Sequence, residues 1–110
     1  PDRPNCVCSQ ATDELHAADP LPMLATPKAS LERLIEIIDG LPRSTVREKN
    51  ANYLHVEFRS RVMGFVDDVE FYVDPADGVV HFRSASRLGY SDLGVNRDRM
   101  QKIAREYLGS

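Results

Sequence analysis

The sequence predicts an α+β fold, a two-layer sandwich with two helices packed on one face of a four-stranded antiparallel meander sheet. Three observations support this prediction. Apolar residues recur at helical spacing in two segments and with a period of two between them. Short turn sequences join the period-two segments, which favours antiparallel neighbours. The 110 residues have the size of one domain, so we expect residues 1–110 to form a single unit.

Residues 1–25 are expected to form an ordered, extended N-terminal arm. Prolines interrupt helix formation there, and Leu15 and Leu21 are among the apolar side chains that the arm can bury. One option is that the arm folds across the polar face of the sheet, which would bury part of that face and pair some of its charges. Cys6 and Cys8 are two residues apart, where a disulfide would be strained. Metal binding would need a second pair of ligands at matching spacing, so we interpret them as independent thiols.

The first helix is predicted over residues 26–40. Thr26 is a favourable N-cap, Pro27 suits the first helical position, and Gly40 is expected at C′, just past the end. The meander follows over residues 44–85. Its strands are predicted at Ser44–Lys49, Tyr53–Ser60, Asp68–Asp74 and Val79–Ala85, with a hairpin turn at Asp74–Gly78.

The last helix is predicted over residues 96–108, with Asn96 as its N-cap. The helices should cover the sheet face that carries the alternating apolar residues. The opposite face would then carry the polar residues His55, Glu57, Arg59, Glu70, Tyr72, His81 and Arg83. This face is either a solvated surface with cross-strand ion pairs or a site whose histidines and carboxylates hold a divalent metal.

The net charge of the chain limits the classes of partner that we expect. The formal net charge is −3, so the chain has no surplus of Lys and Arg to displace counterions from nucleic acid phosphates. We therefore expect no nucleic acid partner. No apolar run approaches the length of a membrane-spanning helix, and no secretory signal pattern is recognisable. The sequence starts at Pro1 without methionine, and we expect a segment upstream of it that serves as a signal, an anchor or neither.

Three motifs resemble one family. They are PNCVCSQ, DDVEFYVD and RSASRLGYSDLGVNRDR, and together they resemble the bacterial and plastid domain-of-unknown-function family numbered fourteen ninety-nine. The resemblance extends from Pro4 to about Leu108, although the family usually has serine in place of Cys8. Many members carry an N-terminal signal, lipidation site or membrane segment. The resemblance therefore implies a periplasmic or membrane-anchored extracytoplasmic setting, but it supplies no established activity.

The family pattern directs attention to one set of polar residues. The candidate site consists of Arg83, Ser84, Ser86, Arg87, Asp92, Asn96, Arg97, Asp67 and Asp68. Arginine donors, flexible Gly89 and Gly94, and a helix start at Asn96 would together form a cradle for an anion. The same residues would form an internal clasp if an aspartate were the anion, and both interpretations remain open at the level of sequence.

Two functions follow. The first is a non-catalytic envelope domain that binds an anionic small molecule, a lipid head group or a protein partner, without cofactor or metal. The alternative is a hydrolase or metal-dependent enzyme whose residues would be Asp67, Asp68, Glu70, His55 and His81. A triad of Ser84 or Ser86 with His81 and Asp92 lacks the glycine pattern of a nucleophile elbow. No catalytic residue is assigned.

Overall fold

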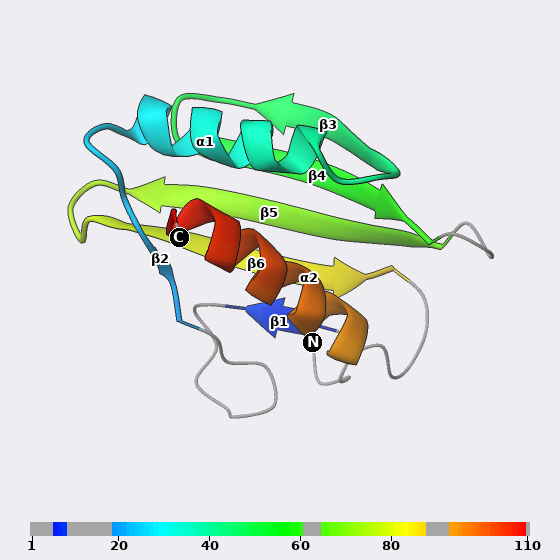
Figure 1. The fold of residues 1–110 in the computed structure, drawn as a ribbon. Coiled ribbons are helices and arrows are strands. Elements are labelled where there is room, and N and C mark those ends of the chain that lie inside the picture. Colours follow the sequence, from blue (N-terminus) through cyan, green and yellow to red (C-terminus); the bar gives the residue numbers. More distant parts are fainter. Residues whose placement is uncertain (1–5, 9–18, 61–64, 88–92, 110) are drawn as a thin grey trace.

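The computed structural model describes residues 6–8, 19–60, 65–87 and 93–109 (Figure 1). Both predicted helices and all four predicted strands are present, and no end is shifted by more than three residues. The elements are β1 (Cys6–Cys8), β2 (Leu21–Pro22), α1 (Pro27–Asp39), β3 (Ser44–Lys49), β4 (Tyr53–Arg59), β5 (Val66–Asp74), β6 (Val79–Ser86) and α2 (Leu93–Tyr107). The chain is therefore α+β, as the sequence predicted.

The sheet is larger than the predicted meander. Its order is β1-β6-β5-β4-β3, every described pairing is antiparallel, and β2 also pairs with β6. Cys6 pairs with Ala85 through β1, and Leu21 pairs with Val80 through β2. The four-strand prediction was incomplete because β6 would otherwise be an edge with unpaired backbone groups, and the two short strands satisfy them. The described parts of the N-terminal arm thus lie along an edge of the sheet.

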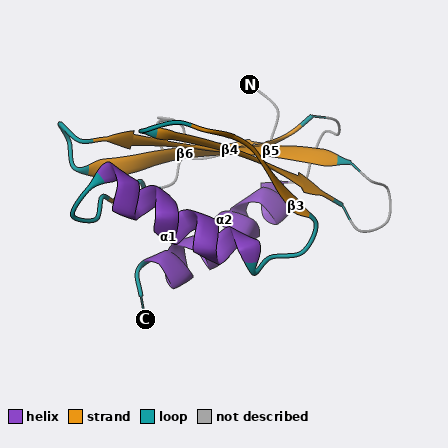
Figure 2. Cartoon of the chain, turned by 90° about the horizontal axis from the view of Figure 1, so that it is seen from above, coloured by secondary structure: helices purple, strands orange, loops and turns teal. Residues whose placement is uncertain are grey.

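Both helices lie on the same side of the sheet, as predicted (Figure 2). The core fills the space between these layers, where the even-numbered residues of β4 and the odd-numbered residues of β5 point toward the helices. Its buried apolar members are Leu21, Leu31, Leu34, Ile38, Leu54, Val56, Phe58, Val69, Phe71, Val73, Val80, Phe82, Met100, Ile103 and Tyr107. The described part of the chain leaves the opposite face without a helix, and we call it the open face. Neither α1 nor α2 is long and apolar enough to cross a membrane.

The start of α1 is as predicted, but its end differs. The Thr26 hydroxyl accepts a hydrogen bond from the Ala29 N–H at 3.0 Å. Gly40 ends the helix with a φ of −82°, so it does not occupy the left-handed C′ conformation that we expected. The Gly40 N–H instead donates to the Ile37 carbonyl at 3.1 Å, which continues the right-handed turn. The left-handed backbone occurs three residues later, at Arg43 with a φ of 60°.

The start of α2 corrects a second prediction. The helix begins at Leu93, so Asn96 is its fourth residue and not its N-cap, and Gly94 lies in its first turn. Asn96 is fully buried because its side chain packs against β6, which removes it from the helix start where an anion would bind. The predicted N-cap at Asn96 is therefore wrong. Gly89 and Asp92 lie outside the described residues.

The hairpin between β5 and β6 matches its prediction. The Asp74 carboxylate accepts hydrogen bonds from the N–H groups of Ala76 at 3.1 Å and Asp77 at 3.3 Å. Gly78 has a φ of 66°, a left-handed conformation that glycine adopts without steric cost. This turn fixes the register in which Asp74 lies opposite Val79.

Candidate functional site

The predicted site residues divide between the two faces of the sheet because side chains alternate along a strand. Asp67 lies opposite Ser86 on β6, and both point toward α2. The next residue, Asp68, lies opposite Glu57 on β4 and points to the open face. Two adjacent carboxylates therefore belong to two separate networks, and the described residues of the candidate site do not all converge at one place.

The first network lies between the sheet and α2, and we call it the α2 latch. Its members are Asp67, Ser84, Ser86, Asn96 and Arg99. The Arg99 guanidinium donates to the Asp67 carboxylate at 2.7 Å, and the Ser86 hydroxyl donates to the same carboxylate at 2.6 Å. The Asn96 amide donates to the Ser86 hydroxyl at 3.3 Å and accepts from the Ser84 hydroxyl at 2.5 Å. The hydrogen bonds thus run in one direction, from donors on α2 and β6 to the carboxylate on β5.

The latch is an internal structure. Asp67 is 8% exposed, and both Ser84 and Asn96 are 0% exposed. The Arg99 guanidinium also lies 4.7 Å from the centre of the Phe58 ring, close enough for a cation–π interaction. Because the charges of Asp67 and Arg99 satisfy each other, these residues hold α2 against the sheet and leave no vacant charge for a ligand.

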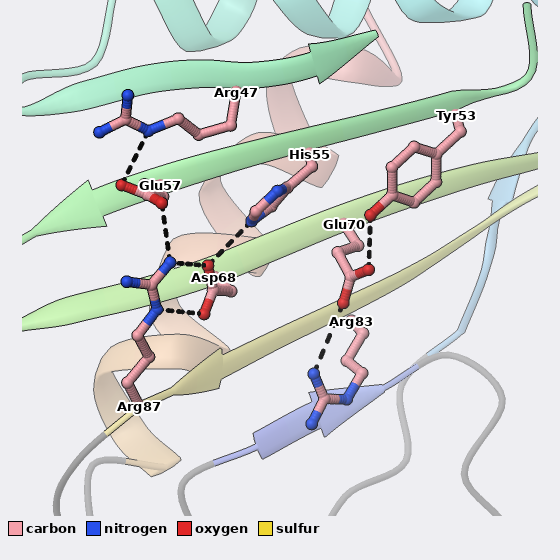
Figure 3. A network of polar contacts seen from close by, with 8 residues as sticks. All are labelled: Arg47, Tyr53, His55, Glu57, Asp68, Glu70, Arg83 and Arg87. Carbon is pink, nitrogen blue, oxygen red and sulfur yellow. Dashed lines mark hydrogen bonds and ion pairs between the residues drawn. The ribbon is translucent and has the colours of Figure 1, made fainter. Parts of the chain in front are cut away.

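The second network lies on the open face and is shown in Figure 3. We call it the open-face network, and its members are Arg47, His55, Glu57, Asp68 and Arg87. Arg87 forms a two-point contact with Asp68, at 2.7 Å from its Nε and 2.9 Å from its Nη2. The same Nη2 donates to Glu57 at 2.7 Å, and Glu57 also pairs with Arg47 at 3.0 Å. His55 Nε2 lies 2.8 Å from Asp68.

These contacts lower the pKa of both carboxylates. The hydrogen bond from Arg87 is the main reason that the pKa of Asp68 is lowered, and His55 adds to it. The hydrogen bond from Arg47 is the main reason that the pKa of Glu57 is lowered, with a further contribution from Arg87. The same pairing raises the pKa of Arg87. At neutral pH the network therefore holds two carboxylates and two guanidinium groups whose charges cancel.

A smaller group lies beside this network on the open face. The Tyr53 hydroxyl donates to Glu70 at 2.6 Å, and Glu70 in turn lies 3.6 Å from Arg83 (Figure 3). Burial is the main reason that the pKa of Tyr53 is raised, and the bond to Glu70 reinforces it. Arg83 is 40% exposed, and among the described residues its contact with Glu70 is long for a hydrogen bond. Arg83 is therefore held less tightly than Arg87.

The structure brings together some predicted site residues and separates others. Ser84, Ser86, Asn96 and Asp67 meet in the latch, whereas Asp68, Arg87 and Arg83 lie on the open face. Arg97 is half-buried on α2. The triad of Ser84 or Ser86 with His81, which the sequence did not favour, does not form, because the serines point toward α2 and His81 lies on the opposite face. The predicted enzyme set is divided too, since Asp67 is on the other side of the sheet from Asp68, Glu70, His55 and His81.

Two important residues were left out of the predicted site. Arg47 is two residues after Thr45, which lies opposite Glu57, so alternation along β3 places Arg47 on the open face, and this spacing was a usable signal. Arg99 belonged to the motif but was not assigned to the site. Its position three residues after Asn96, and therefore on the same side of the helix, was a usable signal.

One group on the open face has the residue types of a metal site. Ligand atoms of His55, Glu57 and Asp68 all lie within 4.8 Å of one another. However, the oxygens of both carboxylates already accept hydrogen bonds from Arg47 or Arg87. A cation would have to displace these guanidinium groups, so the arrangement favours a charge network over a metal centre.

The fold and its networks define a two-layer α+β domain that buries one polar cluster beneath a helix and exposes another on an open sheet face. The chain belongs to the family described as "Protein of unknown function (DUF1499)", whose sequence profile matches residues 1–107. The family resemblance inferred from the three motifs is thereby confirmed. Searches of curated proteins and of solved structures gave no significant match.

Proposed function

We propose that this chain is a non-catalytic domain that binds a carboxylate- or phosphate-bearing partner on its open face, with Arg83 as the main contact. The partner is a small molecule, a lipid head group or a protein that presents such a group. The observation that carries the proposal is the difference between Arg83 and the other two arginines of the same motif with described contacts. The ion pair of Arg83 with Glu70 measures 3.6 Å, whereas Arg87 and Arg99 form contacts of 2.7 Å with their carboxylates.

The chemistry of Arg83 suits an anion. A guanidinium is planar, stays protonated and presents donors in a fork that matches carboxylate and phosphate oxygens. Arg83 lies opposite Glu70, which Tyr53 also binds. Because Tyr53 donates to Glu70, the carboxylate depends less on Arg83, and an incoming anion has less to displace. These contacts support Arg83 as the arginine most ready to exchange its internal partner for a ligand.

An aromatic row lies directly beside this arginine. Tyr53, Tyr72 and His81 are cross-strand neighbours on β4, β5 and β6. Tyr72 and His81 are each two residues along their strand from Glu70 and Arg83, and therefore lie on the same face. Tyr72 is 50% exposed. A half-exposed aromatic side chain next to an arginine is typical of residues that dominate binding interfaces. This row supports a ligand that combines an anionic group with an apolar or ring-shaped portion.

A panel of anions tests the proposal by thermal shift. Phosphate, citrate, acetate, and vesicles with anionic or neutral head groups would be compared at constant ionic strength, which separates free anions from lipid head groups. A ligand that prefers the folded state raises the melting temperature with concentration. We expect Arg83→Gln to abolish this shift. Arg59→Gln, which removes another exposed arginine of the open face, should retain it. An equal shift in wild type and Arg83→Gln would contradict the proposal.

The alternative is a metal-dependent hydrolase that uses His55, Glu57 and Asp68. The closeness of their ligand atoms is the observation in its favour. Hydrolysis of model esters or phosphoesters that requires a divalent metal and is lost in His55→Gln would support it. Activity that persists in this variant would exclude it.

The cellular setting is a further part of the proposal. The family resemblance is the support for placing the domain at the cell envelope, outside the cytoplasm. A reporter enzyme that folds only outside the cytoplasm, fused to the C-terminus of the full-length protein, should be active. An inactive reporter on a stable fusion would contradict this setting.

A further inference from the structure

The hairpin between β5 and β6 gathers a second set of metal-ligand side chains, separate from the open-face network. Ligand atoms of Asp74, Asp77 and His81 all lie within 4.8 Å of one another. Asp74 lies opposite Val79, and His81 lies opposite Tyr72, so Asp74 and His81 are diagonal neighbours on the open face. Asp77 joins them from the turn. The three side chains come from a strand end, a turn and the returning strand.

The backbone holds this arrangement in place. One oxygen of Asp74 accepts hydrogen bonds from the N–H groups of Ala76 and Asp77, which orients the carboxylate and leaves its second oxygen for a ligand. The Gly78 carbonyl accepts from the Met23 N–H at 2.9 Å, so the chain before α1 is attached to the turn. The pairing of β2 with β6 secures the base of the hairpin. The group is therefore preorganised to a greater degree than side chains on an isolated turn.

The charge of this group distinguishes it from His55, Glu57 and Asp68. The ion pairs of the described residues neutralise Glu57 and Asp68 with two arginines, but none of them joins a basic side chain to Asp74 or Asp77. Two carboxylates thus lie close together beside an imidazole, and no Lys or Arg of the described residues pairs with either carboxylate. Their mutual repulsion would be relieved by a divalent cation.

We propose that Asp74, Asp77 and His81 bind a divalent transition metal ion of the zinc class. One imidazole nitrogen and two carboxylate oxygens are donors that Zn²⁺ accepts, and water would complete the coordination at this exposed site. Ligand atoms about 2.0–2.2 Å from an ion lie at most about 4.4 Å apart. Small rotations of the side chains in the turn would bring the three ligand atoms to these distances. Mg²⁺ and Ca²⁺ prefer sites made only of oxygen and should bind more weakly. The proposal does not depend on anion binding at Arg83, although His81 also belongs to the aromatic row beside that arginine.

Titration of the purified chain with Zn²⁺, followed by calorimetry and by histidine side-chain NMR, tests the inference. We expect one equivalent to bind and the His81 ring resonances to shift. His81→Gln should abolish binding, and Asp77→Asn should weaken it about tenfold or more. Asp77 is preferable to Asp74 for this purpose, because Asp74 also orders the turn.

His55 provides a matched control. His55→Gln removes an imidazole outside the proposed site and should leave the Zn²⁺ affinity unchanged. Backbone NMR spectra would show that each variant is folded. Absence of saturable binding, or binding that survives His81→Gln, would overturn the proposal. Asp77→Asn leaves both Arg83 and the aromatic row intact, so this variant should keep any anion-dependent thermal shift, and the two proposals can fail separately.

Discussion

Asp67 and Asp68 are consecutive residues of β5, yet each carboxylate binds an arginine on a different face of the sheet. Asp67 pairs with Arg99 of α2 at 2.7 Å, and Asp68 pairs with Arg87 at the end of β6, also at 2.7 Å. The two arginines stand on either side of residues 88–92. A single strand therefore holds the chain before and after that segment, once through a buried ion pair and once through an exposed one.

The buried pair should matter more for stability. Arg99→Ala would leave the Asp67 carboxylate, which is 8% exposed, without its cation. Removing one partner of a buried ion pair is strongly destabilising, so we expect the free energy of unfolding to fall by about 3 kcal/mol. Urea denaturation followed by circular dichroism measures this change.

The control is the double variant Asp67→Ala/Arg99→Ala. Because it removes both charges together, it should be less destabilised than the sum of the two single variants. A loss below about 1 kcal/mol for Arg99→Ala, the range of surface pairs, would show that the latch is not an important buried contact.

The exposed pair should respond to salt. Arg87 has a side chain that is 49% exposed, so its contacts with Asp68 and Glu57 are screened by ions in solution. Arg87→Ala should therefore destabilise the protein less than Arg99→Ala, and the difference from wild type should shrink as NaCl is raised. Unfolding curves at low and high NaCl test this. If Arg87→Ala and Arg99→Ala lost the same unfolding free energy at both salt concentrations, Arg87 would not be in a solvent-screened ion pair.

The lowered pKa values of Glu57 and Asp68 predict an acid-sensitive contribution to stability. In the unfolded chain these groups take up protons at higher pH than in the folded protein, so acid favours unfolding. Their contribution should be fully present above about pH 5 and should decline as pH falls through the lowered folded values. Unfolding free energies measured from pH 7 to pH 2 should show this decline. Asp68→Asn should make the curve flatter, and an unchanged slope would argue against the pairing.

Two glycines form a matched test of backbone conformation. Gly78 has a φ of 66°, so Gly78→Ala should destabilise the fold by about 1 kcal/mol even though nothing lies within 4 Å of the added Cβ. Gly40 has a φ of −82° and ends α1 in a right-handed conformation. The Cβ added in Gly40→Ala would be 3.4 Å from the Ile37 carbonyl oxygen, which is an acceptable contact distance. Because alanine also restricts the unfolded chain, this variant should be neutral or slightly more stable than wild type. Thermal unfolding should show a lower melting temperature for Gly78→Ala than for Gly40→Ala, and the reverse order would contradict these backbone conformations.

Much of the fold could be predicted from local sequence patterns. Thr26 and Pro27 mark the start of α1, and the alternation from Tyr53 to Arg59 identifies both the strand and its buried face. The pairing of β1 and β2 with β6 could not be predicted, because two- and three-residue strands have no measurable period. The start of α2 was misplaced because Asn96 is a good N-cap by residue type, and its buried partners on β6 depend on tertiary packing.

The candidate site was predicted in its residues but not in its arrangement. The sequence indicated arginines that pair with Asp67 and Asp68, and the structure contains such pairs. It could not show that the two aspartates act on opposite faces, since the strand was expected to begin at Asp68 and actually begins at Val66. Extending the strand by two residues places Asp67 within the alternation and therefore on the side of α2.

The side-chain Nε resonances of the arginines offer the most direct test of anion binding on the open face. A ¹⁵N-detected NMR titration with phosphate would report on Arg83, Arg87 and Arg99 separately. The account predicts a saturable shift at Arg83 while the Arg99 signal stays fixed in its buried pair with Asp67. A titration that moves Arg99, or that leaves Arg83 unchanged while another arginine saturates, would contradict it.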